Sequence, residues 1–485
     1  MTAHFEREFD VIVIGAGAVG ENVAERVVRG GLTAVLIEAE LVGGECSYWA
    51  CMPSKALLRP GTALHAAQTV PGAEQAVTRV LDAEAVLKRR DYFTSNWQDD
   101  SQVKWVEDTG IDLIRGHGWI TGPRRAEVAG LDGNNYALVA RHAVVLATGS
   151  RPSIPPIEGL DDVDYWTTRE ATSAREVPPR LGVLGGGVAG TELAQAFARL
   201  GSAVTVVARG GLLGAFPDPA SELVQAGLRA DGVKLYLRTG TRSVHENDDG
   251  SLTLALDGSG SVTVDKLLVA TGRQPALEGL GLENAGLSAD DGKPLRLETD
   301  ASGLVRGADD NDATPWLYAV GDAAGKVLLT HQGKYEARAT GDAIAARAKG
   351  TLSGEPAPWS PYAHTADEHA VPNVVFTDPE LANVGRSLAQ AQKDGYRAKS
   401  VQLPIQVAGS SLHSEHYKGW AQLVVDEDRK VLLGATFAGP DVAELLHAAT
   451  VAVVGEVPLD RLWHAVPSYP TISEVWLRLL EDYGL

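Results

Sequence analysis

Cys46 and Cys51 are the only cysteines among the 485 residues of the chain, and they stand five positions apart. A disulfide that closes so short a loop removes little entropy from the unfolded chain and would barely stabilise a protein of this length. Five positions on a regular α-helix span about 7.5 Å along its axis, whereas the Cα atoms of a disulfide lie about 4.4–6.8 Å apart. The segment between the cysteines must therefore bend, and the pair is better suited to exchanging electrons than to holding the fold.

A helix is expected directly after the second cysteine. Pro53 suits the first turn of such a helix, so Cys51 lies near its N-terminus, where backbone dipoles favour a thiolate. Lys55 follows four residues after Cys51 on the same side, where it could favour negative charge on the sulfur or on an adjacent reduced cofactor. A solvent-facing lysine is the ordinary alternative. Glu192, near the start of a later helix, is its candidate partner, although carboxylates there also commonly compensate the helix dipole.

A glycine-rich turn between a strand and a helix precedes the cysteines. The apolar strand Val11–Ile14 leads into the turn, residues 21–29 are helical in pattern, and a second apolar strand ends at Glu38. Glycines let the backbone approach a pyrophosphate at a helix N-terminus, and an acidic residue at the second strand's end can bind ribose hydroxyls. We therefore expect a dinucleotide on the glycines of this turn, which are Gly15, Gly17 and Gly20.

The same unit recurs after the strand Leu181–Leu184, but the acidic residue is missing. Ala208 and Arg209 follow the second strand, Val204–Val207, in its place. A positive side chain there suits the 2′-phosphate of NADP rather than the free hydroxyl of NAD. The expected nucleotide is therefore NADPH rather than NADH, bound at the glycines Gly185, Gly187 and Gly190.

Three further strand ends carry small-residue turns. Two of them end in Ala-Thr-Gly, at Gly149 and Gly272, which supports two related nucleotide-binding domains, although two buried strands would give the same pattern. A third apolar strand runs into Gly321 and Asp322. Asp322 could face a cofactor hydroxyl or cap the next helix.

A C-terminal domain is expected after the segment 354–361, which contains three prolines and is typical of a linker. Strand patterns at 373–376, 421–425 and 431–437 alternate with helical patterns at 388–393 and 442–454. These patterns predict an α+β fold for the terminal domain.

The charge of the chain excludes some partners. Its net charge is −20 and its sequence pI about 5.0, which argues against nucleic acid or an anionic membrane as the main partner.

The short, charged segment before Val11 cannot hold the apolar core of a signal peptide, and no later stretch reaches transmembrane length. Two cysteines in such a chain suggest the reducing cytoplasm, and they form no recognisable metal site without a histidine cluster.

Together the two glycine turns, the Gly-Gly-x-Cys-x-x-x-x-Cys-x-Pro-Ser-Lys segment, the Ala-Thr-Gly turns and the Gly-Asp turn resemble the class I pyridine nucleotide-disulfide oxidoreductases. This family includes dihydrolipoamide dehydrogenase, glutathione reductase and mercuric reductase, and the resemblance spans nearly the whole chain. It implies an α/β fold with two Rossmann-like nucleotide-binding domains, for FAD and NAD(P), and a C-terminal α+β dimerisation domain of a homodimer. The expected boundaries are 1–155 with 275–352 for FAD, 156–274 for NAD(P), and 360–485 for dimerisation.

The resemblance also implies a role for each candidate residue. Cys46 would be the substrate-facing interchange thiol and Cys51 the flavin-facing charge-transfer thiol. Lys55, paired with Glu192, would lie beside the reactive edge of the flavin. By the same resemblance, FAD would be bound by Gly15, Gly17, Gly20, Glu38 and Asp322, and NADPH by the turn with Gly185, Gly187 and Gly190. The further candidates for cofactor binding are Lys55, Gly149, Arg209 and Gly272.

The chain departs from the family near its C-terminus. The family has His-Pro there, with a following glutamate that orients the histidine, whereas this chain has Tyr469 and, after Thr471, Glu474. A tyrosine, with a pKa of about 10, is ionised in only about one molecule in a thousand at pH 7, against about 6.5 for histidine. Dithiol exchange would thus lose its acid-base catalyst, and His464 is a poor substitute because it is more typically a packed or surface residue. Mercuric reductase also has tyrosine at this place, but it needs a C-terminal cysteine pair that this chain lacks.

These observations predict an enzyme that passes electrons from NADPH through FAD and the Cys46–Cys51 pair to a small-molecule acceptor, foremost a small disulfide. An alternative is a reductase of quinones, other electrophiles or metal ions, in which electrons leave at the flavin. A non-catalytic flavoprotein component is a further alternative.

Overall fold

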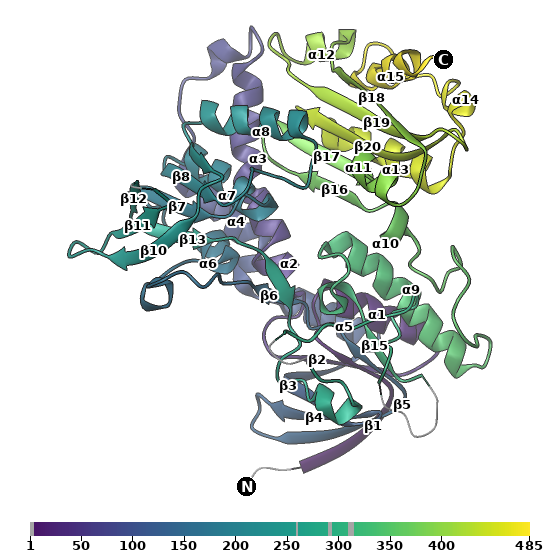
Figure 1. Ribbon diagram of the computed structural model, residues 1–485. Helices are drawn as coiled ribbons and strands as arrows, with labels where there is room; N and C mark the ends of the chain where they lie inside the picture. The colour runs from purple at the N-terminus through teal and green to yellow at the C-terminus, as the bar shows by residue number, and fades with distance from the viewer. Residues whose placement is uncertain (1–3, 259, 290–292, 309–314) are drawn as a thin grey trace. The chain divides into compact units, whose positions relative to one another are not determined.

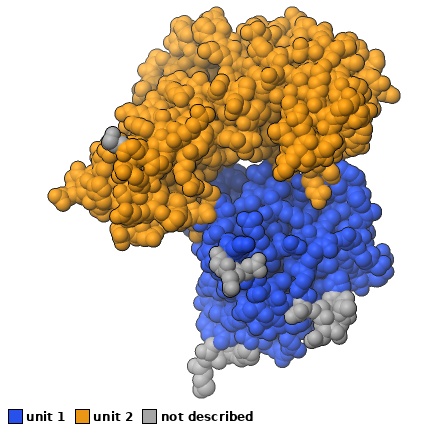
Figure 2. All heavy atoms as spheres, in the orientation of Figure 1, with its two compact units in different colours: residues 1–52, 94–152, 273–367 blue, residues 53–93, 153–272, 368–485 orange. Residues whose placement is uncertain are grey.

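The computed structural model describes residues 4–258, 260–289, 293–308 and 315–485 (Figure 1). Two compact units divide the chain, and each is assembled from three separate stretches of sequence (Figure 2). Unit 1 comprises residues 1–52, 94–152 and 273–367. Unit 2 comprises residues 53–93, 153–272 and 368–485.

Unit 1 is built on a six-stranded sheet in the order β1-β2-β3-β4-β5-β15, in which β1 also pairs with β5. Only β4 runs antiparallel to its neighbours in this sheet. Val11 of β1 lies opposite Ala34 of β2, and both strands have the continuous apolar runs of parallel strands buried on two faces. The strands are β1 (His4–Ile14), β2 (Ala34–Glu38), β3 (Asp112–Gly122), β4 (Arg125–Gly130), β5 (Asn135–Leu146) and β15 (Leu317–Ala319), with a separate antiparallel pair β6 (Ser150–Pro152) and β14 (Arg273–Pro275).

Three helices cover one face of this sheet: α1 (Ala18–Arg29), α5 (Asp100–Asp108) and α9 (Thr330–Ala348). Their apolar residues, among them Val23 and Ala337, form one buried cluster with the strands. Arg26 Nε of α1 also donates to Asp342 Oδ1 of α9 at 2.9 Å. The remaining elements are α2 (Gly44–Tyr48) and the 3₁₀ turns η2 (Ser95–Trp97), η4 (Leu282–Ala285) and η5 (Gly321–Ala324).

Unit 2 contains a second parallel sheet, in the order β13-β7-β8-β9, and an antiparallel sheet β10-β11-β12. Helix α7 connects β7 to β8 and is buried along most of its length, including Glu192. The strands are β7 (Arg180–Leu184), β8 (Ala203–Ala208), β9 (Lys234–Leu237), β10 (Thr241–Glu246), β11 (Leu252–Leu256), β12 (Ser261–Val264) and β13 (Lys266–Val269). The helices are α4 (Ala83–Phe93), α6 (Thr168–Ser173), α7 (Val188–Arg199) and α8 (Asp218–Ala230), with η1 (Glu74–Ala76) and η3 (Leu160–Asp162).

The C-terminal part of unit 2 is a five-stranded antiparallel sheet in the order β16-β17-β20-β19-β18. Its central strands β19 and β20 are buried throughout, and α13 and α15 share their apolar cluster. The strands are β16 (Pro372–Val375), β17 (Glu380–Gly385), β18 (Ala398–Pro404), β19 (Trp420–Asp426) and β20 (Val431–Gly439). The helices are α11 (Leu388–Lys393), α12 (Ala408–His413), α13 (Leu446–Val454), α14 (Leu459–Leu462) and α15 (Val475–Tyr483), with η6 (Val442–Leu445) and η7 (Ile472–Glu474).

Two helices pass from one unit to the other along the chain. Helix α3 (Cys51–Gln68) begins in unit 1 and continues in unit 2, and the short α10 (Ala366–His369) does the same. Within the described ranges, no helix has both the length and the apolar character that a membrane crossing requires.

The first glycine-turn helix begins earlier than the sequence pattern suggested. The expected start was residue 21, but α1 begins at Ala18, so Gly20 lies inside the helix rather than in the turn. Gly17 is extended, and the first intrahelical bond runs from Glu21 N to Gly17 O at 3.1 Å. The first N–H groups of a helix have no partner within it, so residues 18–20 can present theirs to an anion.

Candidate active site

The chain bends between the two cysteines. Helix α2 ends at Tyr48 and α3 begins at Cys51, with Trp49 in a non-helical conformation between them. Trp97 Nε1 donates to Tyr48 O at 3.1 Å and fixes the end of α2. At its start, Gly43 N donates to Ala16 O at 2.8 Å, so the cysteine segment is attached to the first glycine turn.

Within unit 1 the two cysteines lie together as thiols. Cys46 is hydrogen-bonded to Cys51, and Cys51 Sγ lies 3.3 Å from Thr330 Oγ1, at the start of α9. The hydrogen bond to Cys51 and burial raise the pKa of Cys46 well above the ordinary value of a thiol. A proton is therefore favoured on Cys46, which leaves Cys51, at the N-terminus of α3, as the thiol that the helix dipole can ionise.

Lys55 and Glu192 form an ion pair within unit 2. Lys55 Nζ donates to Glu192 Oε2 at 2.7 Å and lies 4.9 Å from the centre of the Phe376 ring. The second carboxylate oxygen, Glu192 Oε1, accepts from Phe376 N at 2.9 Å, and the Glu192 side chain is only 3% exposed. Glu192 thus holds Lys55 in place, and Lys55 is not a freely solvated side chain.

A polar cluster ties the far end of α3 to α7 in the same unit. His65 Nδ1 lies 2.5 Å from Asp378 Oδ2, which also accepts from Arg199 Nη2 at 2.9 Å. The hydrogen bond to Asp378 raises the pKa of His65 above its ordinary 6.5. Burial alone would raise the pKa of Asp378, but the hydrogen bond from His65 and the charge of Arg199 outweigh it and hold that pKa below 3.8.

We expect His65→Ala to lower stability most between about pH 4.5 and 6.5, by about 0.5–1 kcal/mol because the His65 side chain is half exposed. Because the pKa of His65 is raised, its ion pair stabilises the fold fully below pH 6.5, and this stabilisation is lost as the pH rises through the raised pKa. Because the pKa of Asp378 is lowered, its part of the stabilisation is lost only as the pH falls below 3.8. The melting temperatures of the variant and the parent at pH 6 and pH 9 check this. His245→Ala, at an exposed position of β10, is the control, and an equal loss at both pH values would contradict the prediction.

Both glycine turns meet an Ala-Thr-Gly strand end in the same way. Gly15 and Gly185 have φ angles of 103° and 117°, in the region that favours glycine. A Cβ atom on Gly15 would lie 2.4 Å from Ala147 O, and one on Gly185 would lie 2.3 Å from Ala270 O. Each turn therefore requires glycine at its first position. In both units the neighbouring strand end is supplied by the repeated Ala-Thr-Gly sequence.

The residues around the first turn fit FAD. Glu38, at the end of β2, is held by Ala16 N at 2.7 Å and Glu40 N at 2.8 Å, and burial raises its pKa. A buried carboxylate oxygen of Glu21, in the first turn of α1, has no hydrogen-bond partner in the described part of the chain. A buried carboxylate oxygen without a donor, a second carboxylate at the strand end and free helix N–H groups match a cofactor with ribose hydroxyls and a pyrophosphate.

Asp322 lies at the start of η5 and belongs to a polar network that reaches the cysteine segment. Ser150 Oγ donates to Asp322 Oδ2, and Arg273 Nε donates to Ser150 Oγ at 2.7 Å. Arg273 Nη2 in turn lies 3.9 Å from Glu45 Oε2, directly before Cys46. Burial raises the pKa of Asp322. This carboxylate is therefore suited to accept a hydrogen bond from a hydroxyl group.

The second nucleotide turn leaves its positive residue accessible. Gly187 is extended at the N-terminus of α7, and Gly190 lies within its first turn, as in α1. Arg209 directly follows β8, is exposed, and has no hydrogen bond or ion pair to any described residue. Its guanidinium is therefore available to an anion.

The C-terminal candidates do not form a hydrogen-bonded pair within one chain. Tyr469 is 78% exposed, and in the described residues it makes no hydrogen bond to Glu474. Glu474 Oε1 instead accepts from Arg478 Nη2 at 3.0 Å. His464 lies exposed in the segment after α14.

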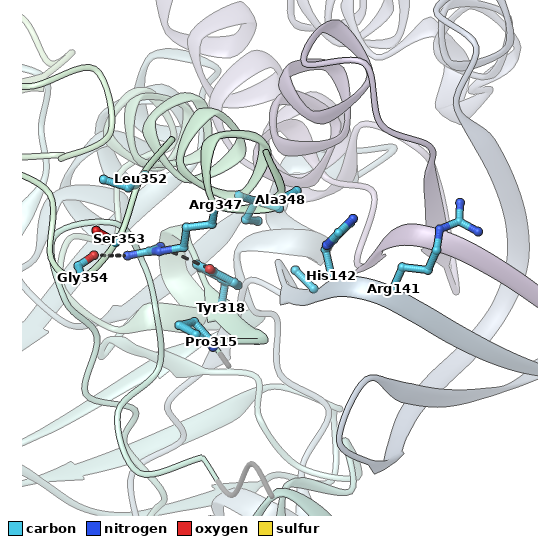
Figure 3. A pocket seen from close by; sticks show the side chains of 11 residues that line it. Arg141, His142, Pro315, Tyr318, Arg347, Ala348, Leu352, Ser353 and Gly354 are labelled. Atoms are coloured by element: carbon cyan, nitrogen blue, oxygen red, sulfur yellow. Dashed lines mark hydrogen bonds between the residues drawn. The ribbon is translucent and has the colours of Figure 1, made fainter. Parts of the chain in front are cut away.

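A pocket of about 280 Å³ in unit 1 is lined by residues of β5, β15 and α9 and by the segment after α9 (Figure 3). Its wall carries Arg347, whose guanidinium donates to Ser302 Oγ at 2.9 Å, Tyr318 OH at 3.2 Å and Gly354 O at 3.0 Å. The arginine is thus already bound to the protein, and much of the remaining lining is apolar, as at Ile344. None of the lining residues is a predicted site residue.

Four residues around the candidate side chains, three in unit 1 and one in unit 2, were not found from the sequence. Thr330 and Arg273 contact the cysteine segment, Ser150 joins Arg273 to Asp322, and Phe376 positions Glu192 and Lys55. Only Thr330 could have been found from the sequence, because it begins a long helical pattern shortly after the Gly-Asp turn. The others are brought to the site by contacts between residues far apart in the chain.

Comparison with known proteins gives matches over nearly the whole chain. The model of the pyridine nucleotide-disulphide oxidoreductases matches residues 9–342, and that of their dimerisation domain matches residues 371–479. A dihydrolipoyl dehydrogenase of Haloferax volcanii is 30% identical, with 98% of this chain and 96% of the relative covered. A mercuric reductase of Acidithiobacillus ferrooxidans is 32% identical, with 96% and 81% covered.

A solved structure has a similar fold. It is the Cu(II) complex of the HOCl-induced flavoprotein disulfide reductase RclA from Escherichia coli, with a TM-score of 0.81 and 24% identity, covering 98% of this chain and 99% of that one. At this identity the likeness concerns the fold alone.

Proposed function

Because the chain belongs to the pyridine nucleotide-disulphide oxidoreductase family, we propose that it carries electrons from NADPH through Cys46 and Cys51 to a small disulfide. As a member of this family it is a flavin-dependent disulfide oxidoreductase that uses FAD and a pyridine nucleotide, and it carries the family's dimerisation domain. The residue roles, the preference for NADPH and the disulfide acceptor are the proposal.

The observation that carries the proposal is the asymmetric thiol pair. Cys46 and Cys51 are hydrogen-bonded to each other on a bend attached to the first glycine turn, and Cys51 begins a helix. When bound, FAD would supply the electron pair of the nicotinamide hydride, and with one proton this would convert the Cys46–Cys51 disulfide to a thiol at Cys46 and a thiolate at Cys51. Thr330 Oγ1, 3.3 Å from Cys51 Sγ, can stabilise a thiolate there by donating its hydrogen.

The exchange with substrate then balances in two steps. Cys46 gives up its proton as its sulfur attacks one sulfur of the substrate disulfide; the new bond is a mixed disulfide, and the other substrate sulfur leaves and takes that proton. Cys51, as thiolate, attacks the sulfur of Cys46, which re-forms the Cys46–Cys51 disulfide and releases the second substrate thiol. The sum is NADPH, a proton and one disulfide converted to NADP⁺ and two thiols.

We propose that Lys55 favours the thiolate of Cys51. It follows Cys51 by one helical turn in α3, and its ion pair with buried Glu192 restricts it to one position. A fixed positive charge one turn away favours an anion more than a mobile one, because no ordering entropy is lost when the thiolate forms.

A second candidate function is favoured by Tyr469. This exposed residue, not hydrogen-bonded to Glu474 within its own chain, stands where the family has its proton donor, and a phenol protonates a leaving thiolate poorly at neutral pH as it is a weak acid. An acceptor that takes electrons without a leaving thiol, such as a quinone, another electrophile or a metal ion, avoids this step. In that case electrons would leave at the flavin.

NADPH is the proposed donor because Arg209, unpaired among the described residues, stands at the strand end where an acidic residue would favour NADH. We also propose that the enzyme works as a homodimer through residues 371–479. A dithiol that must be reduced in every turnover suits a reducing compartment, so we place the enzyme in the cytoplasm.

The test is pyridine nucleotide oxidation by the FAD-loaded enzyme against small disulfides and quinones, with NADPH and NADH compared. We expect disulfide-dependent turnover, with kcat/KM at least about tenfold higher for NADPH, the factor that about 1.4 kcal/mol of phosphate recognition provides. Inert disulfides with active quinones would favour the second candidate. Equal efficiency with NADH would remove the role of Arg209, and failure of either nucleotide to reduce the flavin would leave only a non-catalytic flavoprotein.

A further inference from the structure

Two arginines stand at the same edge of the second parallel sheet. Strands β8 and β9 are parallel neighbours, with Ala208 opposite Leu237, and each strand is directly followed by an arginine, Arg209 and Arg238. Backbone bonds hold these ends together: Arg238 N donates to Gly210 O at 2.9 Å, and Thr239 N donates to Ala208 O at 2.9 Å. The two arginines are therefore fixed on adjacent strand ends.

Neither side chain has a partner in the part of the chain that the structure describes. Arg238 is exposed and, like Arg209, makes no side-chain hydrogen bond or ion pair to any residue that the structure describes. The segments after the two strands, residues 209–216 and 238–241, contain no acidic residue in a chain with 63 of them. Asp257 does contact the second segment, but its Oδ2 accepts from Gly240 N at 3.0 Å. The surroundings of the two guanidinium groups are thus favourable to an anion.

In parallel α/β sheets a dinucleotide binds at the carboxyl ends of the strands. The Gly185–Gly190 turn follows β7, which pairs with β8, so a ribose bound at the end of β8 would lie between that turn and β9. A phosphate on this ribose carries about −1.5 to −2 charges, more than one exposed arginine neutralises. We propose that Arg238 is a second specificity residue, which binds the 2′-phosphate of NADPH from the neighbouring strand.

The inference rests on the proposed use of NADPH, so its test separates the two ideas. Adenosine 2′,5′-bisphosphate carries the phosphate without the nicotinamide, and adenosine 5′-monophosphate lacks it. Calorimetry with the FAD-loaded enzyme should show that Arg238→Gln weakens the bisphosphate about tenfold and leaves the monophosphate unchanged. KM for NADPH should rise about tenfold while kcat and the KM for NADH stay as they were. Arg229→Gln, an exposed arginine on α8, is the control and should change neither probe.

Unchanged bisphosphate binding in Arg238→Gln would overturn the inference. An equal loss of affinity for the bisphosphate and the monophosphate would also overturn it, because such a loss indicates disturbed packing. Arg209→Gln distinguishes this failure from failure of the NADPH proposal. If Arg209→Gln weakens the bisphosphate and Arg238→Gln does not, NADPH remains the donor and Arg238 has no part in its recognition. If the parent enzyme binds both probes equally, no 2′-phosphate site exists and both ideas are wrong.

Discussion

Cys46→Ser is expected to lower disulfide-dependent kcat/KM at least about a thousandfold, while NADPH still reduces the bound flavin at a rate within about threefold of the parent. A thousandfold loss corresponds to about 4 kcal/mol of transition-state stabilisation, reasonable for removal of the attacking atom. Serine retains the volume and the hydrogen bond to Cys51 but is not ionised near neutral pH. The reduction of flavin does not require the sulfur of Cys46, so only the exchange with substrate should fail.

Two measurements on the same preparation check this result: steady-state oxidation of NADPH with a disulfide, and anaerobic bleaching of flavin absorbance after mixing with NADPH. Ser47→Ala, at the next position of α2, is the matched control and should retain both rates. Persistent disulfide turnover in Cys46→Ser would show that Cys46 is not the interchange thiol. Loss of flavin reduction as well would place Cys46 in the first half of the reaction.

Arg90→Met is expected to destabilise unit 2 by about 3 kcal/mol. Arg90 is 1% exposed, and its guanidinium donates to Thr172 O, to Ala174 O at 2.7 Å and to Asp91 Oδ1 at 2.7 Å. The two carbonyls lie at the C-terminal end of α6, where a helix has no partners of its own for them. Methionine replaces much of the volume but leaves both carbonyls buried without donors, and each such loss costs about 1–3 kcal/mol.

Thermal unfolding of the FAD-loaded enzyme, followed by circular dichroism, measures the effect of this substitution. The first unfolding transition should shift down by several degrees, and urea should unfold the variant at a lower concentration. Lys88→Met, on the exposed side of the same helix, controls for the change from a cation to methionine. A transition within about one degree of the parent would show that water or a rearranged α6 replaces the arginine.

Local patterns predicted the parts of the site that lie close together in the sequence. The fold class and the family were confirmed, and strand β2 ends at Glu38 as its apolar run indicated. Cys51 begins a helix, which the position of Pro53 suggested, and α11 has the predicted bounds, 388–393. In each case a turn or cap residue next to a periodic run carries the information.

Contacts between distant segments were not predictable in this way. Phe376 offers its backbone N–H to Glu192 across 184 positions, and Ser150 meets Asp322 across 172. Nothing in the local sequence distinguishes such a serine or phenylalanine from others, because the partner is chosen by the packing of whole sheets. The domain boundaries and residue roles inferred from the family likewise remain predictions.

The alternation of the chain between the two units has a consequence for synthesis on the ribosome. The chain crosses between the units five times, and unit 1 receives its last segment, residues 273–367, only after most of unit 2 has been made. Strand β15 must then pair with β5, whose last residue, Leu146, is made 171 positions before Leu317, the first residue of β15. Until then, residues 144–146 of β5 present an unpaired edge, and such edges favour association with other chains. The sheet of unit 1 therefore stays incomplete until β15 has been made, although its first strand is among the first residues made. We expect the nascent chain to depend on chaperones throughout this time.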